Sequence, residues 1–334
     1  MKHTVTLLLA SSLVTSFATR LPAAEPKRVI VCTVTTGFRH SSIGEAEKTL
    51  QKLADETKAF TIVDFARQPT AEPPKRPEKP KEPAPNADEK AKAKYADDTK
   101  KYEADLAKWT PEVEAKAKVL ATTRDNQMKE SMLKLAPQKL NEQRIDGVIF
   151  ANTTGDLPLP DKEGFIKWIE DGHAFCAMHS GSDTFHGFSG YLDMLQGEFE
   201  THGAQVPADL IAADREHPAN AGIGARWDLK QEEMYLIKRQ DRAKVHALWF
   251  LNHHPNDVAK TGFFPVSWCR LAGKGRVFYT SLGHREDLWS DDPNLKDRKN
   301  PVEISRQYQA HILGGIKWAL GLAEGSAAPN PDVK

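Results

Sequence analysis

The order of short apolar runs and polar loops constrains the fold of this chain more than any other sequence feature. Residues 28–34 form an apolar run that ends in the polar segment T-T-G-F-R-H-S-S. Ser42 and Glu45 form a capping-box pattern, and the apolar residues that follow recur on one helical face: Ile43, Ala46, Leu50 and Leu53. Residues 60–65 predict a second strand. A strand, a helix and a second strand in this order are typical of a parallel sheet in an α/β fold.

The same alternation returns in the second half of the chain. A buried-type strand is predicted at 145–151, and a helix at 161–171 ends before Gly172, as glycine at a helix C-terminus favours. Further strands are predicted at 173–178, 209–213, 234–238, 245–250, 265–271 and 276–281, and a closing helix at 307–320. The last two strands are joined by the turn Gly273-Lys274-Gly275, which predicts a hairpin. We therefore expect an α/β domain over 27–322 with a mostly parallel central sheet, followed by a disordered tail at 323–334.

The composition changes between the two halves. Residues 68–85 are rich in Pro, Lys and Glu, which predicts an extended, solvated segment. Residues 88–118 are rich in Lys, Glu and Ala and predict an exposed helix with a narrow apolar stripe made by Tyr95, Tyr102, Leu106 and Trp109. We interpret 68–118 as a charged helical insertion. Two roles remain open for it, a partner-binding arm or a solvated insertion that lies on its own domain.

The N-terminus has the pattern of a signal peptide. Lys2 and His3 precede an apolar stretch at 5–17, and small residues offer cleavage after Ala18 or Ala24. The stretch is too short for a stable membrane anchor. We therefore expect residues 1–24 to be removed and the protein to be periplasmic or secreted.

Charge and cysteine content exclude several classes of protein. The chain has 46 basic and 46 acidic residues, and this balance does not favour nucleic acid or an anionic membrane as a partner. Oligomerisation stays open. Cys32, Cys176 and Cys269 lie far apart in apolar, strand-like runs. They are expected to be small buried hydrophobic groups rather than a disulfide framework.

Polar loops follow four of the predicted strands. In open α/β sheets, ligands bind beyond the carboxyl ends of the strands, so these loops are expected to form one pocket. The catalytic candidates are His40, His179, Asp183 and His284. The substrate-binding candidates are Arg39, Ser41, Asn152, Thr153, Thr154, Ser180, His186, Arg285, Glu286 and Trp289, whose ring suits the apolar face of a sugar.

Several of these segments resemble the ThuA-like (trehalose utilisation) family. The similar motifs are F-R-H-S-S at 38–42, N-T-T-G-D at 152–156, M-H-S-G-S-D-T-F at 178–185, G-R-V-F-Y-T-S-L-G-H at 275–284 and H-I-L-G-G-I-K-W-A-L-G at 311–321. The resemblance runs from about Arg28 to Gly321, and the segment 68–118 departs from it. It implies a flavodoxin-like sandwich similar to class I glutamine amidotransferases. It also implies a link to trehalose and other disaccharides through 3-keto sugar intermediates.

The comparison with amidotransferases makes glutaminase chemistry an unfavoured interpretation. Their cysteine nucleophile stands in a G-x-C-x-G turn, and the matching frame here reads Ala177-Met178-His179-Ser180-Gly181. His179 occupies the nucleophile position, while Cys176 lies inside the strand, where a thiolate is neither exposed nor activated. A serine hydrolase is not favoured either, because the G-x-S-x-G frame is missing.

The remaining chemistry is acid–base or metal chemistry. Histidine titrates near neutral pH and suits proton transfer. The alternative is a zinc-like divalent ion held by His179, His202, Glu233 and His284, although no H-E-x-x-H spacing occurs. NAD and ATP are not expected, because neither G-x-G-x-x-G nor a P-loop follows the first strand. We expect a histidine-based isomerisation or elimination on a keto-glycoside. A non-catalytic sugar-binding protein and a metal-dependent glycoside hydrolase remain the alternatives.

Overall fold

A nine-stranded sheet forms the centre of the molecule. The computed structural model describes residues 25–69 and 73–334, so the predicted signal peptide lies outside the described residues. The strand order is β2-β1-β3-β4-β11-β10-β9-β6-β7. The first five strands in that order are parallel to one another. Their bounds are Phe60–Ala66 for β2, Lys27–Cys32 for β1, Gly147–Ala151 for β3, Ala174–Met178 for β4 and Gly275–Thr280 for β11.

The other half of the sheet is antiparallel. β10 turns directly into its neighbour β11, so the predicted hairpin is present, and the remaining strands pair antiparallel as well. These strands are β10 (Asp257–Ala272), β9 (His246–His254), β6 (Val206–Ala212) and β7 (Arg226–Glu232). A separate two-stranded sheet pairs β5 (Glu198–His202) with β8 (Tyr235–Lys238). The predicted α/β fold is confirmed, and the parallel half places its four loops at one edge.

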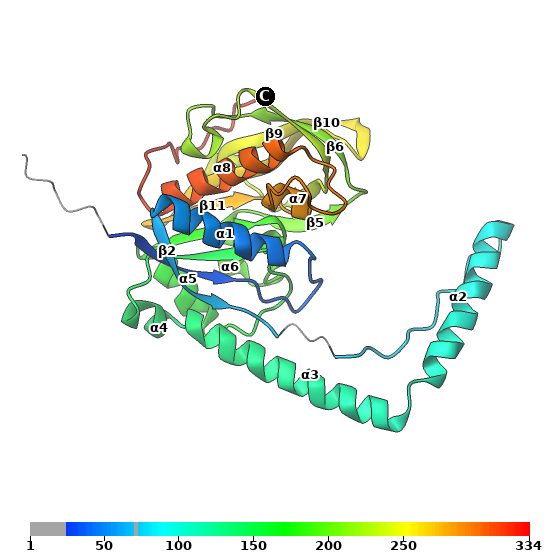
Figure 1. Ribbon diagram of the computed structural model, residues 1–334. Coiled ribbons are helices and arrows are strands. Elements are labelled where there is room, and N and C mark those ends of the chain that lie inside the picture. Colours follow the sequence, from blue (N-terminus) through cyan, green and yellow to red (C-terminus); the bar gives the residue numbers. More distant parts are fainter. Residues whose placement is uncertain (1–24, 70–72) are drawn as a thin grey trace, which may run out of the picture.

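Helices cover both faces of the sheet because its strands are apolar on both sides. In β1, Val29 and Val31 enter one core while Ile30 and Cys32 enter the other, as the two-residue period of a strand requires. The first core packs under α1 (Ile43–Thr57) and α8 (Val302–Ala319), which lie on the same side of the sheet (Figure 1). The second packs under α4 (Pro137–Glu142), α5 (Lys162–Glu170) and α6 (Ser189–Leu195).

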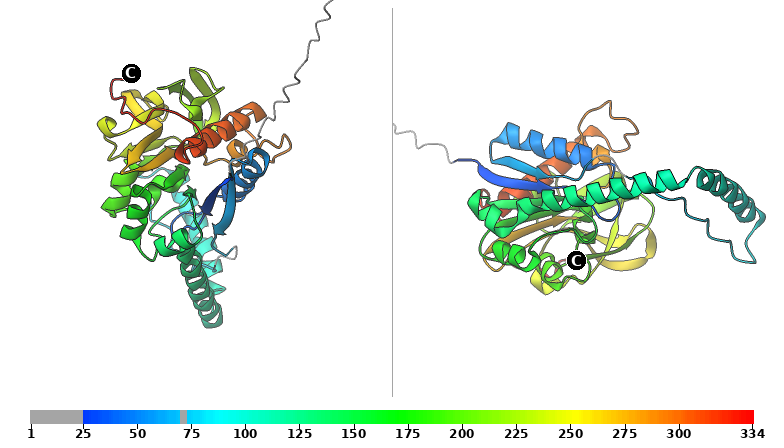
Figure 2. Two further views of the ribbon diagram at one scale, coloured as in Figure 1. Left: turned by 90° about the vertical axis from the view of Figure 1, so that its left-hand side faces the viewer. Right: turned by 90° about the horizontal axis from the view of Figure 1, so that it is seen from below.

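Two helices form an arm that leaves the body of the protein. α2 (Glu89–Ala107) has no buried residue and projects into solvent, whereas α3 (Pro111–Met132) runs back along the body (Figures 1 and 2). The prediction of one helix over 88–118 is therefore corrected. The chain breaks before Thr110, whose side chain accepts a hydrogen bond from the N–H of Val113, and proline occupies the first helical position, as helix starts favour.

The expected end of the insertion near Lys118 falls inside α3. The helix continues to Met132, which is fully buried, and Met128 is nearly so. Both side chains pack in the second core with Cys32. The inner end of α3 is therefore part of the folded body, and only its outer end and α2 are solvated.

The C-terminal tail, expected to be disordered, lies along β9. Asn330 donates from its side-chain amide to the carbonyl of Ala247 at 3.1 Å and accepts from the Ala247 N–H at 2.7 Å. The imidazole of His246 donates to the Ala328 carbonyl, with 2.6 Å between the two atoms. These hydrogen bonds hold the tail in place although it forms neither helix nor strand. Among the described residues, no helix has both the length and the apolar character that a membrane span requires.

Candidate functional site

Four loops meet at the carboxyl edge of the parallel strands. Isolated parallel bridges pair Thr35 with Thr154 and Gly155 with Thr184, so the loops after β1, β3 and β4 continue the order of the sheet. The side-chain amide of Asn152 donates to the hydroxyl of Ser42 and to the carbonyl of Gly283, both at 2.9 Å. Asn152 therefore ties the loop after β11 to the other loops.

Ser42 has a different role from the predicted one. It precedes α1, but its side chain makes no capping hydrogen bond. Its hydroxyl instead donates to the carbonyl of Gly283 at 3.1 Å. The capping-box pattern predicted the start of the helix correctly, yet the hydroxyl serves to join two loops of the site.

His179 stands at a sharp turn after β4. Its φ angle is +49°, a left-handed conformation that is uncommon for residues other than glycine and that often marks functional positions. The ring is fully buried, and Nδ1 donates to the carbonyl of Ser281 at 2.8 Å. This bond fixes the tautomer, so Nε2 carries a lone pair.

Three polar groups surround Nε2 of His179. Nε2 of His40 lies at 3.1 Å, the hydroxyl of Tyr235 at 2.8 Å and Oε2 of Glu233 at 3.7 Å. Nδ1 of His40 in turn lies 3.3 Å from the hydroxyl of Ser180. The loops after β1 and β4 and the start of β8 thus place their polar side chains around one point. We call His40, His179, Glu233 and His284 the histidine–glutamate cluster.

Glu233 joins the fourth member of this cluster to the rest. Its Oε2 lies 3.1 Å from Nδ1 of His284, and its Oε1 lies 3.0 Å from Nδ1 of His202. The contact with His284 is close, but Nδ1 of His284 is buried and makes no hydrogen bond of acceptable geometry. The two groups are therefore in close contact as an ion pair.

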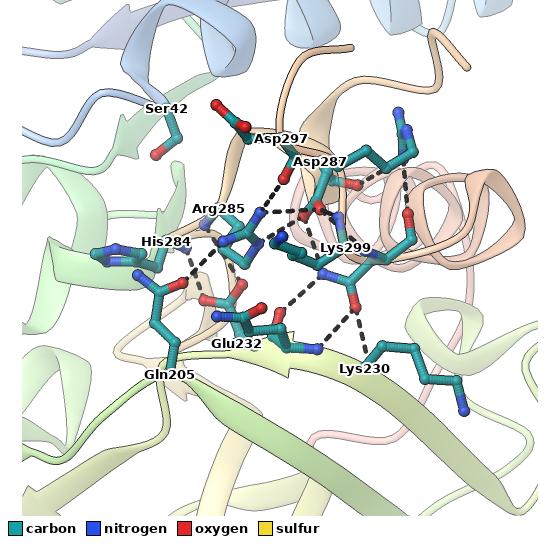
Figure 3. A network of polar contacts seen from close by, with 12 residues as sticks. Ser42, Gln205, Lys230, Glu232, His284, Arg285, Asp287, Asp297 and Lys299 are labelled. Atoms are coloured by element: carbon teal, nitrogen blue, oxygen red, sulfur yellow. Dashed lines mark hydrogen bonds and ion pairs between the residues drawn. The ribbon is translucent and has the colours of Figure 1, made fainter. Parts of the chain in front are cut away.

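A second layer of contacts holds His284 in place. The buried carboxylate of Glu232 accepts the backbone N–H of His284 at 2.9 Å and that of Arg285 at 3.4 Å (Figure 3). The guanidinium of Arg285 pairs with Asp287, and Asp287 also accepts from the side chain of Asn300 at 2.9 Å. This network fixes the backbone at His284 and at Arg285.

The cluster separates its histidines into two electrostatic types. Burial, aided by the charge of His284, lowers the pKa of His40 to about 4. Burial also lowers the pKa of His179 well below its usual value. Burial alone would lower the pKa of His284 as well, but the carboxylates of Glu233 and Glu232 outweigh it and raise the pKa. Two imidazoles whose pKa is lowered therefore stand beside one whose pKa is raised.

Burial also raises the pKa of two other groups next to the cluster. Burial raises the pKa of the Tyr235 phenol well above its usual value, so its hydroxyl remains a donor. Burial likewise raises the pKa of Glu232 to about 7. Sequence reasoning missed both residues. Tyr235 lies two positions after Glu233 in E-E-M-Y, and the two-residue period of the strand it enters was the signal that could have identified it.

Other predicted residues lie away from the cluster. Asp183 and His186 pair with each other at 2.6 Å, and His186 also contacts Glu198 at 2.7 Å, in a partly exposed group. His202, predicted as a metal ligand, touches the cluster only through Glu233, and its place is taken by His40. Burial raises the pKa of the Cys176 thiol, which fits the expected inert role in β4.

The predicted substrate-binding residues divide into structural and accessible ones. Trp289 is fully buried and donates from its indole to the carbonyl of Gly283, so the expected sugar stacking is corrected to core packing. Thr153, Thr154 and Ser180 are buried, Thr153 against Thr184 and Thr154 against the Phe38 carbonyl. The residues with partly or fully exposed surface are Arg39, Ser41, His186, Arg285 and Glu286.

A pocket of about 600 Å³ adjoins the loop after β1. The loop forms one wall with Phe38 and Arg39, and the inner end of α3 forms another with Arg124 and Met128. Phe38 is 67% exposed, and its ring lies 4.9 Å from the ring of His40. The pocket and the histidine–glutamate cluster therefore share the Phe38–His40 segment.

The chain is similar to ThuA-like proteins of known structure. It aligns with such a protein from Parabacteroides merdae at 15% identity and a TM-score of 0.55, covering 92% of this chain and 99% of the other. A second ThuA-like protein, from Bacteroides uniformis, aligns at 15% identity with a TM-score of 0.51, covering 96% and 100%. At this identity the likeness establishes the fold alone. No curated protein matches this chain.

A family model described as trehalose utilisation matches residues 100–319. The match covers more than half of the chain and includes His179, Glu233 and His284, while His40 precedes it. The predicted family is confirmed: the chain belongs to the ThuA family, whose members are linked to carbohydrate utilisation.

Proposed function

We propose that this protein acts in carbohydrate utilisation as an exported enzyme that moves a proton next to the carbonyl of a 3-keto-disaccharide or a related keto-glycoside. Family membership supports the carbohydrate role. The carbonyl at C3 makes the neighbouring C–H acidic, so an isomerisation or an elimination needs a proton acceptor, a proton donor and a group that polarises the carbonyl. None of these steps needs NAD or ATP.

The observation that carries the proposal is the buried cluster itself, in which Nε2 of His179 lies 2.8 Å from the hydroxyl of Tyr235 and 3.1 Å from Nε2 of His40. Adjacent groups whose surroundings push their pKa values apart are the usual arrangement for an acid–base pair. On imidazole chemistry alone, Nε2 of His179 offers a lone pair and accepts the proton. The raised pKa of His284 favours its protonated form, and this imidazole and the hydroxyl of Tyr235 serve in the proposal to polarise or protonate the carbonyl oxygen. Burial keeps these groups out of bulk water and strengthens their electrostatic effect.

The pocket beside the cluster supports a substrate with more than one sugar ring. Its volume of about 600 Å³ suits a ligand of small-molecule size. Phe38 offers an exposed aromatic face, and Arg39 and Asp156 offer polar groups of the kind that sugar hydroxyls bind. One ring would sit at the cluster and the other in this pocket, so the inner end of α3, which follows the segment 68–118, contributes to substrate binding.

Hydrogen exchange tests the proposal directly. The protein is incubated with a 3-keto-disaccharide in D₂O, and proton NMR follows deuterium entry at the carbons next to C3 together with product formation. We expect exchange with the wild type and a loss of about 10²–10⁴-fold in His179→Ala. Cys176→Ala, which changes a buried residue of the adjoining strand, is the matched control and keeps its rate. Calorimetric binding without exchange would instead identify a non-catalytic sugar-binding protein.

A further inference from the structure

We propose that His40, His179, Glu233 and His284 together bind one divalent metal ion of the zinc class. The four residues come from four different parts of the chain, and each offers one ligand atom that lies within 4.8 Å of the other three. Three are buried and His284 is partly so. The predicted metal set is thereby revised by one residue, since His40 replaces His202.

The spacing of the ligand atoms matches a tetrahedral ion. Zinc bonds of about 2.0–2.1 Å to nitrogen and oxygen give a tetrahedron with edges of about 3.3 Å. The distances between neighbouring ligand atoms are 3.1 Å for His40 and His179, 3.1 Å for His284 and Glu233, and 3.7 Å for His179 and Glu233. Small side-chain shifts therefore suffice to place all four atoms around one ion.

The hydrogen bonds around the cluster leave lone pairs that face inward. Nδ1 of His179 donates to the Ser281 carbonyl, so the inward Nε2 is a ligand atom rather than a donor. Nδ1 of His284 is buried and lacks a hydrogen bond although Glu233 is 3.1 Å away. Nδ1 of His284 is therefore available as a ligand atom next to Oε2 of Glu233.

The outer contacts are those that orient metal ligands in proteins. Metal-bound histidines almost always use the second ring nitrogen for a hydrogen bond, and ligating carboxylates are themselves hydrogen-bonded. His179 has the Ser281 carbonyl in this role, and His40 has the Ser180 hydroxyl at 3.3 Å. The free oxygen of Glu233 lies 3.0 Å from His202. His202 is thus an outer contact of the proposed site rather than a ligand.

The donor set selects the class of ion. Three imidazole nitrogens and one carboxylate suit zinc and similar first-row ions, whereas magnesium and calcium prefer oxygen ligands. This inference rests on the proposed function for its substrate, and it changes the role of His179 from proton acceptor to ligand. The ion would polarise the C3 carbonyl oxygen.

Metal titration tests the site without any substrate. The protein is stripped with a chelator, dialysed and titrated with Co²⁺ and Zn²⁺, while visible absorption reports the Co²⁺ geometry and elemental analysis reports the Zn²⁺ content. We expect one equivalent per chain and a higher Tm, because an ion that binds only the folded protein stabilises it. His40→Ala and Glu233→Gln should weaken binding by at least about 100-fold, more than the loss typical of an outer contact.

Two further variants separate ligands from their neighbours. Tyr235→Phe removes a hydroxyl that competes for the lone pair of His179, so binding should be at least as tight as in the wild type. His202→Ala removes an outer contact and should weaken binding by at most about 10–100-fold. Circular dichroism checks that each variant folds. Equal binding by the wild type, His40→Ala and Glu233→Gln would overturn the site, as would less than 0.1 equivalent in the reconstituted wild type at about 1 mM metal.

The outcomes also distinguish this inference from the proposed function. One bound equivalent without C–H exchange would support the site and contradict the proposed reaction. Exchange at an undiminished rate in chelator-treated protein of verified zero metal content would support the reaction and overturn the role of the ion in it. Exchange that is lost on stripping and restored by Zn²⁺ would support both.

Discussion

The buried histidine of α8 should make the protein lose stability in mild acid. His311 is fully buried, and its Nδ1 donates to the carbonyl of Ala219 at 2.7 Å. Its Nε2 has no partner, and the rings of Trp227 and Phe278 lie 5.5 and 5.3 Å away. Burial lowers the pKa of His311 to about 4. The unfolded chain therefore takes up a proton here at a higher pH than the folded protein does.

The sign and size of the effect follow from proton linkage. The pKa of His311 is about 6.5 in the unfolded chain and about 4 in the folded protein. The free energy of unfolding therefore has its full value above pH 6.5, and it decreases as the pH falls from 6.5 toward 4. Between pH 7 and pH 5 the loss is about 2 kcal/mol. His217, whose pKa burial also lowers to about 4, adds a similar loss in the wild type.

Urea unfolding of His311→Asn at pH 7, 6 and 5 measures this contribution. The asparagine amide can still donate to Ala219, and it does not titrate in this range. Its smaller size lowers stability at every pH, so the informative quantity is the change with pH within each variant. We expect that change to shrink by about 2 kcal/mol relative to the wild type. His253→Asn, at an exposed position of β9, is the control and should follow the wild-type curve. Parallel curves for the wild type and His311→Asn would refute the reasoning.

Three further predictions concern the site and the arm. In turnover assays, His179→Ala should lose about 10²–10⁴-fold in rate while Cys176→Ala keeps its rate and thiol reagents do not inhibit; the reverse pattern would restore a cysteine nucleophile. Replacing residues 88–109 with a short Gly/Ser linker should leave the free energy of unfolding nearly unchanged, because α2 buries no residue. Met132→Ala should instead lower it by about 2–5 kcal/mol in urea unfolding. Equal losses of unfolding free energy in the two variants would contradict this division of the arm. Asn152→Ala should cost about 1–3 kcal/mol, because it leaves the buried oxygen of the Ser42 hydroxyl without a donor and removes one of the donors to the Gly283 carbonyl; an unchanged stability would show that Asn152 does not join the loops.

Much of the fold was predictable because its strands are local apolar runs. β1, β3, β4 and β11 lie within a few residues of the predicted ranges. Parallel strands bring their carboxyl ends to one edge, so the convergence of His40, His179 and His284 followed from the strand order alone. The break in the arm also had a local signal, since threonine followed by proline at 110–111 is a typical helix start.

The remaining features depend on contacts between distant parts of the chain. Glu232 is the last residue of β7, and its carboxylate accepts the backbone N–H of His284, 52 residues later in the chain. No local sequence pattern predicts this contact. Trp289 follows a site loop in sequence, yet its side chain turns into the first core. The tail at 323–334 lacks any periodic pattern that could predict its position. Hydrogen bonds to β9, such as those between Asn330 and Ala247, hold it in place.

The arm is anchored in the core only at the inner end of α3, and its outer end is solvated. Measured along the helix axis at 1.5 Å per residue, the outer end of α3 at Pro111 lies about 32 Å from the anchored Met132, and Arg124 lies about 12 Å from it. A swing of about 5° would therefore sweep the outer end through about 3 Å and displace the pocket wall by about 1 Å. Such a motion of the outer end would therefore displace the pocket wall near Phe38 by no more than the thermal motion of an ordinary side chain.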